Sequence, residues 1–299
     1  MERQVFTNEC PLPVYDRGDL TKKHILGSGG NSDVYYVTHK DGGEYAAKIY
    51  KHDEWSDKDA FYNELLDEIR LYEYMSGMTH IVKVYGISIC GDEGDFDVWV
   101  LMENYNMDLG DYIQSTTMWK TVCKNSDRDY RVWNKVERQW YIYKLQNEEK
   151  LMIMKSSLTA LEQLHRKFIV HGDIKTNNMI WDIKTQTIIL IDFGSSYYID
   201  SGDSIESSGS GTPGYMAPEQ MGGTLSYSCD IYSWAVSMIE IWNGDIWSGD
   251  DSTKICRNEV LYALRKIEKN APMIGQVLRK CVSLDSRKRP SLRNIHKNI

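Results

Sequence analysis

The chain has 299 residues, of which 41% are hydrophobic and 26% charged, so it can build a large core beneath an ordinary charged surface. Its formal net charge of −8 argues against general binding to nucleic acid or to anionic membranes, because both require a cationic surface. The six cysteines include no C-x-x-C pair, and neither a signal peptide nor an apolar run of roughly 18 residues is present. These features predict a soluble protein of the cytoplasm or nucleus with reduced thiols and no membrane partner.

The first part of the chain has the pattern of a small sheet with one helix. Residues 1–18 are expected to be a leader, because two prolines disfavour regular structure there. From 20 to 50, β-branched and aromatic runs separated by glycine-containing turns predict an antiparallel meander. Residues 58–76 have apolar side chains at three- and four-residue spacing and predict an amphipathic helix. The runs HIVKVYGISI and DFDVWVLMEN then return to strand character.

The remainder of the chain is mainly helical in pattern. LMIMKSSLTALEQLH and DIYSWAVSMIEIW predict buried helices. We therefore expect an α+β protein with a smaller lobe over 19–104 and a larger lobe over 105–299. Residues 114–150 fit neither lobe and mix tryptophans with Lys and Arg. They are either a structural excursion with a helical piece or a docking surface for a protein partner, while RNA binding would need a shaped aromatic platform.

Two features in the smaller lobe suggest phosphate binding. The segment GSGGNSDV at 27–34 lies between two predicted strands, where glycines allow backbone N–H groups to approach phosphate oxygens. A Gly-rich hairpin turn explains this segment equally well. Lys48 lies in the next strand run, AAKIY, where a buried lysine requires an anionic partner. Glu68 in the predicted helix is a candidate for that partner.

The stretch VHGDIKTNNMIWDIKTQTIILIDFG gathers polar groups beside strands that look buried. Asp173, Lys175 and Asn178 lie in one loop, and Asp192 follows the apolar run TIILI. Carboxylate and amide oxygens suit Mg²⁺ when substrate phosphates and water complete its coordination. Asp173 then remains to accept a proton from an attacking hydroxyl.

From about residue 19 to the end, the chain resembles a eukaryotic protein kinase catalytic domain. The Gly-rich loop at 27–34, the Tyr-Ala-Ala-Lys motif at 45–48 and the catalytic loop at 171–178 follow in the family's order. Asp-Phe-Gly at 192–194 and Ala-Pro-Glu at 217–219 bracket the activation segment. The resemblance implies a bilobal α+β fold, with a small antiparallel β-sheet lobe carrying one helix and a larger, mainly helical lobe.

The resemblance also implies ATP and Mg²⁺ as cofactors. Lys48 would orient the nucleotide, and Glu68 would hold Lys48 in place. Glu64 is the alternative partner for Lys48, but the segment EIRLYEYM reproduces the family's apolar spacing better when Glu68 has this role. Asp192 and Asn178 would hold the metal ions. The implied nucleotide-binding residues are Gly27, Ser28, Gly29, Gly30, Asn31, Ser32 and Val34 in the loop, with Ala46, Lys48, Met102, Glu103, Tyr105 and Ile180 around the base.

By the same resemblance, Asp173 would accept or orient the substrate hydroxyl, and Lys175 would lie near the γ-phosphate. Lys175 together with Thr212 in GTPGYMAPE favours Ser/Thr over Tyr as the acceptor, although some families with both residues also accept Tyr. Asp230 and Arg289 match two supporting positions, and Arg289 is expected to pair with Glu219.

Two departures from the family pattern concern regulation. Gly172 occupies the position where most regulated kinases carry an Arg that binds a phosphorylated activation segment, so that contact is absent. Residues 195–212 are rich in hydroxyls and are either a flexible loop or a set of autophosphorylation sites. Ser32 stands where the third glycine of the loop is usual. With GSGGNSDVYYV, MENYNMDL and IILIDFGSS, it gives a narrower similarity to the monopolar-spindle checkpoint kinases.

The sequence therefore predicts an ATP-dependent protein kinase for Ser/Thr hydroxyls, with Tyr as a further acceptor and a role in cell-cycle or spindle-checkpoint signalling. A pseudokinase scaffold that binds nucleotide without transfer is the alternative, but it would normally lack one of Lys48, Asp173 or Asp192. A small-molecule kinase is disfavoured by GTPGYMAPEQ and Arg289, which belong to the architecture for protein substrates.

Overall fold

The computed structural model contains two compact units. Residues 1–107 and 191–194 form the first, called here the N-terminal unit, and residues 108–190 and 195–299 form the second, the C-terminal unit. The segment 191–194 thus belongs with the first unit although it lies far along the chain. The structure describes residues 3–29, 32–51, 57–92, 95–105, 108–111, 132–134, 139–141, 145–199, 204–207, 209–243 and 257–299.

The N-terminal unit is built on a six-stranded sheet with the strand order β1-β5-β6-β4-β3-β2. Its strands are β1 (Val14–Tyr15), β2 (Leu20–Ser28), β3 (Ser32–His39), β4 (Glu44–Tyr50), β5 (Val84–Asp92) and β6 (Asp95–Met102). The β2, β3 and β4 strands form the predicted antiparallel meander. A buried cluster of Leu20, Val37, Ala47, Trp99 and Leu101 ties these strands to β6.

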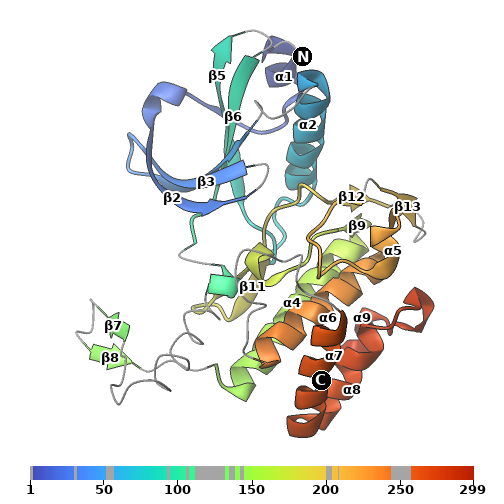
Figure 1. Cartoon of the computed structure of the whole chain (residues 1–299). Helices are drawn as coiled ribbons and strands as arrows, with labels where there is room; N and C mark the ends of the chain where they lie inside the picture. Colours follow the sequence, from blue (N-terminus) through green and yellow to red (C-terminus); the bar gives the residue numbers. More distant parts are fainter. Residues whose placement is uncertain are drawn as a thin grey trace. The chain divides into compact units, whose positions relative to one another are not determined.

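Helix α2 (Lys58–Tyr74) accompanies this sheet and lies beside β5 and β6 in Figure 1. The side chain of Asp57 caps its first turn by accepting from Ala60 N at 3.0 Å. Its buried residues recur at helical spacing, as the sequence predicts. The chain turns away after Met75, and Gly77 adopts a φ of +83°, a conformation typical of glycine at helix ends.

The expectation that residues 1–18 lack regular structure was wrong. Residues Arg3–Glu9 form α1, Arg17–Asp19 form the 3-10 helix η1, and β1 adds to the sheet as the parallel partner of β5. The prolines at 11 and 13 lie between α1 and β1, so they shape the connection without interrupting either element. The N-terminal unit consequently has a second helix besides α2.

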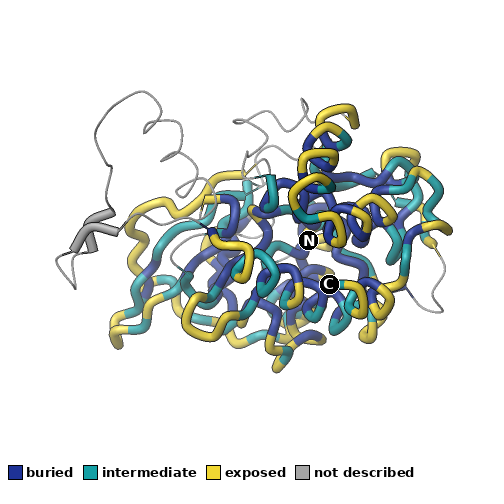
Figure 2. The backbone as a smooth tube through the Cα atoms, turned by 90° about the horizontal axis from the view of Figure 1, so that it is seen from below, coloured by how far each residue is buried: buried dark blue, intermediate teal, exposed yellow. Residues whose placement is uncertain are grey.

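The C-terminal unit is mainly helical, as predicted. Its helices are α4 (Asn147–Arg166), α5 (Pro218–Met221), α6 (Tyr227–Asn243), α7 (Arg257–Asn270), α8 (Pro272–Cys281) and α9 (Leu292–His296). Every residue of α6 from Cys229 to Ile241 is buried, which explains its almost continuous apolar sequence. In other parts of the described chain, buried and exposed stretches follow one another along the backbone, as the colours in Figure 2 show. Among the described helices, none is both long and apolar enough to cross a membrane.

Short strand pairs shape the loops of this unit. They are β9 (Ile169–Val170) with β12 (Tyr197–Tyr198), β10 (Met179–Asp182) with β11 (Thr187–Leu190), and β13 (Ile205–Glu206) with β14 (Thr224–Leu225). Most of the predicted insertion at 114–150 lies outside the described residues. Its described part includes the antiparallel pair β7 (Val132–Asn134) and β8 (Gln139–Tyr141), and α4 begins before residue 150.

Candidate active site

The Gly-rich turn between β2 and β3 is closed by polar contacts at its base. Ser28 Oγ donates to the Asp33 carboxylate, and Lys51 Nζ lies 3.1 Å from Asp33 Oδ1. Lys51 also donates to the carbonyl of Gly29 at 2.9 Å, and Gly29 N donates to the carbonyl of Ser32 at 2.8 Å. The predicted residues Gly27, Ser28, Gly29, Ser32 and Val34 lie in β2, in the turn or in β3, whereas Gly30 and Asn31 lie outside the described residues.

Lys48 and Glu68 are buried together within the N-terminal unit, and the half-buried Asp192 completes a cluster of three charges. Lys48 Nζ lies 2.8 Å from Glu68 Oε1 on α2 and 2.7 Å from Asp192 Oδ1. The hydroxyl of Tyr72, one turn further along α2, donates to Glu68 Oε1 at 3.1 Å. Glu64 is exposed, so Glu68 is the glutamate that pairs with Lys48. This helix face is therefore fixed to β4 by charge as well as by apolar packing.

The charge of Lys48 is stabilised by its two carboxylate neighbours. Burial alone would lower the pKa of Lys48, but Asp192 and Glu68 offset burial and raise that pKa well above its ordinary value. Burial and the charge of Glu68 raise the pKa of Tyr72 well above its usual range, so the phenol remains a hydrogen-bond donor. The two carboxylates thus keep the Lys48 side chain cationic within the N-terminal unit.

The Asp-Phe-Gly segment is shaped by backbone conformation and close packing. Asp192 has a φ of +62°, in the left-handed region that non-glycine residues rarely adopt. The ring of Phe193 packs edge-on against Tyr72 with centroids 5.6 Å apart. A Cβ on Gly194 would lie 3.3 Å from Glu68 Oε2, so a larger residue would crowd the ion pair.

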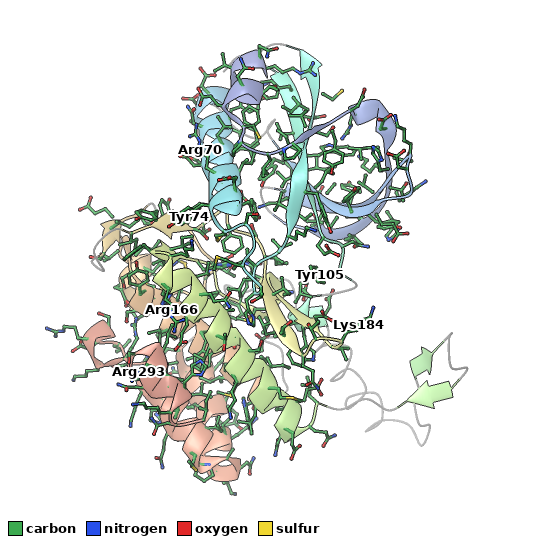
Figure 3. All side chains as sticks on the ribbon, turned by 180° about the vertical axis from the view of Figure 1, so that it is seen from behind. Arg70, Tyr74, Tyr105, Arg166, Lys184 and Arg293 are labelled. Carbon is green, nitrogen blue, oxygen red and sulfur yellow. The ribbon has the colours of Figure 1, made fainter. Side chains whose placement is uncertain are left out.

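The residues predicted to surround the base occupy β4, β6, the segment after β6 and, in the C-terminal unit, β10. Ala46 pairs with Met102 across β4 and β6, and both are buried. The backbone N–H of Glu103 donates to the carbonyl of Lys83 at 2.8 Å, so of the two backbone polar groups of Glu103 the carbonyl oxygen is the one left to serve a ligand. Tyr105, labelled in Figure 3, follows β6 in the same unit. Ile180 lies buried in β10 of the C-terminal unit.

In the C-terminal unit, the Asp173 carboxylate is held by three neighbours. Lys175 Nζ lies 3.0 Å from Asp173 Oδ2, and Thr212 N donates to Oδ1 at 2.8 Å. Asn178 Nδ2 donates to Oδ2 at 3.0 Å. Lys175 Nζ also donates to Thr212 Oγ1 at 2.7 Å, so the predicted acceptor-selecting pair is in direct contact. The structure brings these four predicted residues together.

Asn178 has the geometry of an oxygen ligand. Its Nδ2 donates both to the carboxylate and to the backbone carbonyl of Asp173, at 3.0 and 2.8 Å, which leaves its amide oxygen to offer. Among the described residues, no cluster of three or more His, Cys, Asp or Glu could hold a metal by itself. A Mg²⁺ ion would therefore need nucleotide phosphate oxygens as further ligands, which fits the chemistry of this donor set.

Asp230 at the start of α6 anchors the backbone of the catalytic loop. Its buried carboxylate accepts from His171 N at 2.9 Å and from Gly172 N at 3.0 Å. His165 Nε2 on α4 lies 2.9 Å from the same carboxylate. Two backbone donors satisfied by one buried acceptor fix the conformation of the loop just before Asp173.

Gly172 has a structural explanation that the sequence did not supply. Its φ is +78°, and a Cβ at this position would lie 2.2 Å from the carbonyl oxygen of Ser195. The carbonyl of Gly172 accepts from Gln220 Nε2 at 2.6 Å, and the same nitrogen donates to the carbonyl of Ser210 at 2.9 Å. Sequence reasoning missed Gln220, because a single Gln after Ala-Pro-Glu carries no distinctive pattern.

Glu219 and Arg289 form the pair expected by resemblance. The Arg289 side chain is fully buried and donates through both terminal nitrogens to the Glu219 carboxylate, with Nη2 to Oε2 at 2.8 Å. Burial would raise the pKa of Glu219, but Arg289 lowers it below its ordinary value. The pair closes the end of the activation segment against the start of α6, because Arg289 also donates to the carbonyl of Ser228 at 2.9 Å.

A buried glutamate behind the catalytic loop was also missed. Glu240 Oε2 on α6 accepts from Thr176 Oγ1 at 3.0 Å and from the Tyr215 hydroxyl at 2.9 Å. Its Oε1 has no partner among the described groups, and burial raises the pKa of Glu240 to about 7. The signal was available in the sequence, since Glu240 stands among apolar residues near the end of the run DIYSWAVSMIEIW.

The chain matches curated proteins at low identity. Myosin-IIIa of Mus musculus is 26% identical over 292 residues, which cover 91% of this chain and 16% of that protein. The membrane-associated tyrosine- and threonine-specific cdc2-inhibitory kinase of Drosophila melanogaster is 25% identical over 230 residues, covering 74% and 37%. Serine/threonine-protein kinase D of Synechocystis is 36% identical over 101 residues, covering 32% and 20%. The chain thus spans well under half the length of each of these relatives.

None of these three relatives is a monopolar-spindle checkpoint kinase by name, so that narrower similarity stays a prediction. The family model described as the protein kinase domain matches residues 20–298, which is nearly the whole chain. With that match, the chain belongs to the protein kinase family.

Proposed function

We propose that this chain transfers the γ-phosphoryl group of ATP to Ser and Thr hydroxyls of protein substrates. The observation that carries the proposal is the arrangement around Asp173. One carboxylate is oriented by a backbone N–H, an amide and a lysine, and that lysine also contacts Thr212. Such preorganisation suits a group that must receive a hydroxyl proton in a defined direction.

Each unit contributes distinct groups to this reaction. Lys48, kept charged by Glu68 and Asp192, offers a fixed cation to the nucleotide phosphates. Lys175 lies beside Asp173 and can neutralise charge on the transferred group, while Asp173 accepts or orients the attacking hydroxyl. When bound, Mg²⁺ would neutralise phosphate charge. The side-chain oxygens of Asn178 and Asp192 are the protein ligands that would hold it.

One contact favours Ser/Thr as acceptor. The 2.7 Å contact between Lys175 and Thr212 links the catalytic loop to the end of the activation segment, in the pairing that the sequence associates with Ser/Thr acceptors. One relative, the Drosophila kinase, is named for both tyrosine and threonine, so Tyr is the second acceptor to test. Phosphoamino-acid analysis of a labelled protein substrate distinguishes the two.

We further propose a signalling role in the cell cycle, based on the short similarities to the checkpoint kinases. Residues 114–150 would select a substrate or partner in that role. Deleting 116–148 should then leave transfer to a generic substrate intact and reduce transfer to a natural one. Loss of folding on deletion would assign the segment a structural role instead.

The test of transfer uses radiolabelled Mg-ATP and a generic basic protein, with the wild-type chain beside Asp173→Asn and Lys48→Met. We expect both variants to stay folded and to lose transfer, Asp173→Asn by about 10²- to 10⁴-fold. Exposed residues supply matched controls: Asp41→Asn and Lys184→Met should keep wild-type rates.

Two outcomes would defeat the proposal. Wild-type activity in Asp173→Asn would remove the assigned role of its carboxylate. A wild-type chain that binds Mg-ATP without transferring phosphate to any protein, itself included, would establish the pseudokinase alternative. Mass spectrometry of the same incubations reports whether residues 195–212 become phosphorylated.

A further inference from the structure

The segment that precedes the matched kinase domain has no role in the proposed function. The family match begins at residue 20, yet residues 3–15 form a helix and a strand that are integrated into the N-terminal unit. Helix α1 packs against α2, the helix that carries Glu68. The question is whether this packing bears on the Lys48–Glu68 pair.

Phe6 is the apolar anchor of the segment. Its side chain is fully buried, with ring centroids 5.9 Å from Tyr62 on α2 and 5.4 Å from Phe96 on β6. Tyr62 and Phe96 are themselves stacked at 4.1 Å, and the Tyr62 hydroxyl donates to the Phe96 carbonyl at 2.8 Å. Phe6 therefore completes a three-ring cluster that joins α1, α2 and the sheet.

Polar contacts hold the two ends of the segment on the same unit. Arg3 Nη1 donates to the carbonyl of Gly91 at 3.0 Å, at the end of β5. Arg70 Nη2 on α2 lies 2.8 Å from Glu9 Oε2, at the end of α1; Figure 3 labels Arg70 on that helix. Further along, Ile87 N donates to the carbonyl of Pro13 at 2.8 Å, which begins the β1–β5 pairing.

The contacts on α2 flank the functional glutamate. Tyr62 precedes Glu68 and Arg70 follows it on the same helix, so α1 contacts α2 on either side of Glu68 along the chain. We propose that residues 3–15 are a brace that positions α2 so that Glu68 pairs with Lys48. The brace is a positioning element: it touches neither nucleotide nor substrate. Its effect on catalysis rests on the proposed kinase activity.

The test compares point variants of the full chain. Phe6→Ala removes the buried anchor, Phe6→Leu keeps an apolar side chain there, and Val5→Ala changes an exposed neighbour on α1. We expect Phe6→Ala to lower kcat/KM for ATP by tenfold or more, Phe6→Leu to recover most of it, and Val5→Ala to match wild type. Glu9→Lys places a cation opposite the exposed Arg70 and should lower kcat/KM for ATP two- to fivefold while the chain stays folded.

Amide hydrogen exchange gives a readout that does not depend on activity. In Phe6→Ala, exchange within α2 should accelerate by tenfold or more, whereas exchange within α6 should stay at wild-type rates. Equal acceleration in both helices would show general destabilisation and overturn the brace. Unchanged exchange in α2 would also overturn it. An inactive wild-type chain with selective exchange in α2 would refute the kinase proposal while keeping the positioning role.

Discussion

The Lys48 cluster and the Asp173 cluster organise their functional groups by different physical means. Lys48 is buried and depends on two carboxylates that come from separate elements, α2 and the segment at 191–194. Asp173 is held by one ammonium group, that of Lys175, and by hydrogen bonds from the Asn178 amide and the Thr212 backbone N–H, all from residues of the C-terminal unit. One site balances charges against desolvation, and the other fixes a carboxylate by local geometry.

Because of this difference, we expect substitutions in the two clusters to affect the stability of the fold and the rate of phosphoryl transfer to different extents. A buried charge that loses its partner destabilises the fold, because the remaining charge stays desolvated. A carboxylate with several hydrogen-bond donors tolerates replacement by an amide of the same shape, because some of those contacts survive. Substitutions at Lys48 should therefore reduce both stability and transfer, whereas substitutions at Asp173 should reduce transfer alone.

The largest effect on stability is expected for Lys48→Met. This change leaves Glu68 buried without its cation and should lower the free energy of unfolding by roughly 3–5 kcal/mol. Asp173→Asn should change the same quantity by less than about 1 kcal/mol. Urea denaturation followed by tryptophan fluorescence measures both.

A double variant identifies the cause of that loss. Adding Glu68→Leu to Lys48→Met removes the stranded carboxylate, so the double variant should be more stable than Lys48→Met. Additive losses from the two substitutions would contradict the account of Lys48 as a charge balanced against Glu68.

Glu240 extends the comparison, because it is a buried carboxylate that has no cationic partner among the described residues. Its pKa of about 7, against 4.5 ordinarily, means that the folded chain binds its proton more tightly than the unfolded chain does. Its contribution to stability is therefore largest below about pH 4.5 and is lost as the pH rises to about 7. The loss amounts to about 3 kcal/mol, at 1.4 kcal/mol per pH unit.

Glu240→Gln removes this titration. The stability of the variant relative to wild type should rise between pH 5 and pH 8 by up to about 3 kcal/mol, measured by urea denaturation at each pH. Glu268→Gln is the control, because the hydrogen bond from Arg279 lowers the pKa of Glu268 at a half-buried site. Parallel pH curves for wild type and Glu240→Gln would show that Glu240 does not titrate in this range.

The sequence predicted the elements whose information is local. The meander over 20–50, α2, α4 and α6 were confirmed, because strand and helix periodicities are properties of neighbouring residues. Of the two glutamates that the sequence offered, Glu68 lies on the buried face and pairs with Lys48, whereas Glu64 is exposed. The assigned roles of the active-site residues remain predictions for the kinetic tests.

Long-range pairings could not be predicted in the same way. The sequence predicts a leader over residues 1–18, whereas the order of this segment depends on β5, α2 and Phe96, which are distant in sequence. Gln220 was missed for the same reason: its two acceptors, the carbonyls of Gly172 and Ser210, come together only in the folded chain.

Gln220→Leu tests a contact made entirely of neutral groups. It leaves two backbone carbonyls without their donor and should lower the free energy of unfolding by about 1–3 kcal/mol. Phosphoryl transfer to the substrate should fall even when the phosphorylation state of the activation segment is unchanged, because Gln220 links the catalytic loop to that segment directly. Met221→Leu, at an exposed neighbour, is the control for α5. Wild-type stability in Gln220→Leu would mean that water satisfies both carbonyls.

The smallest effect is expected at Thr212, where backbone and side chain contribute separately. Thr212→Val removes the hydroxyl that accepts from Lys175 but keeps the backbone N–H that donates to Asp173. If the backbone bond fixes the carboxylate, kcat should fall only about 10- to 150-fold, the equivalent of one hydrogen bond to a charged group at about 1.5–3 kcal/mol. Thr212→Ser restores the hydroxyl and should recover most of the rate. A loss as large as that of Asp173→Asn would mean that Lys175, positioned by Thr212, carries the catalysis assigned here to the geometry of Asp173.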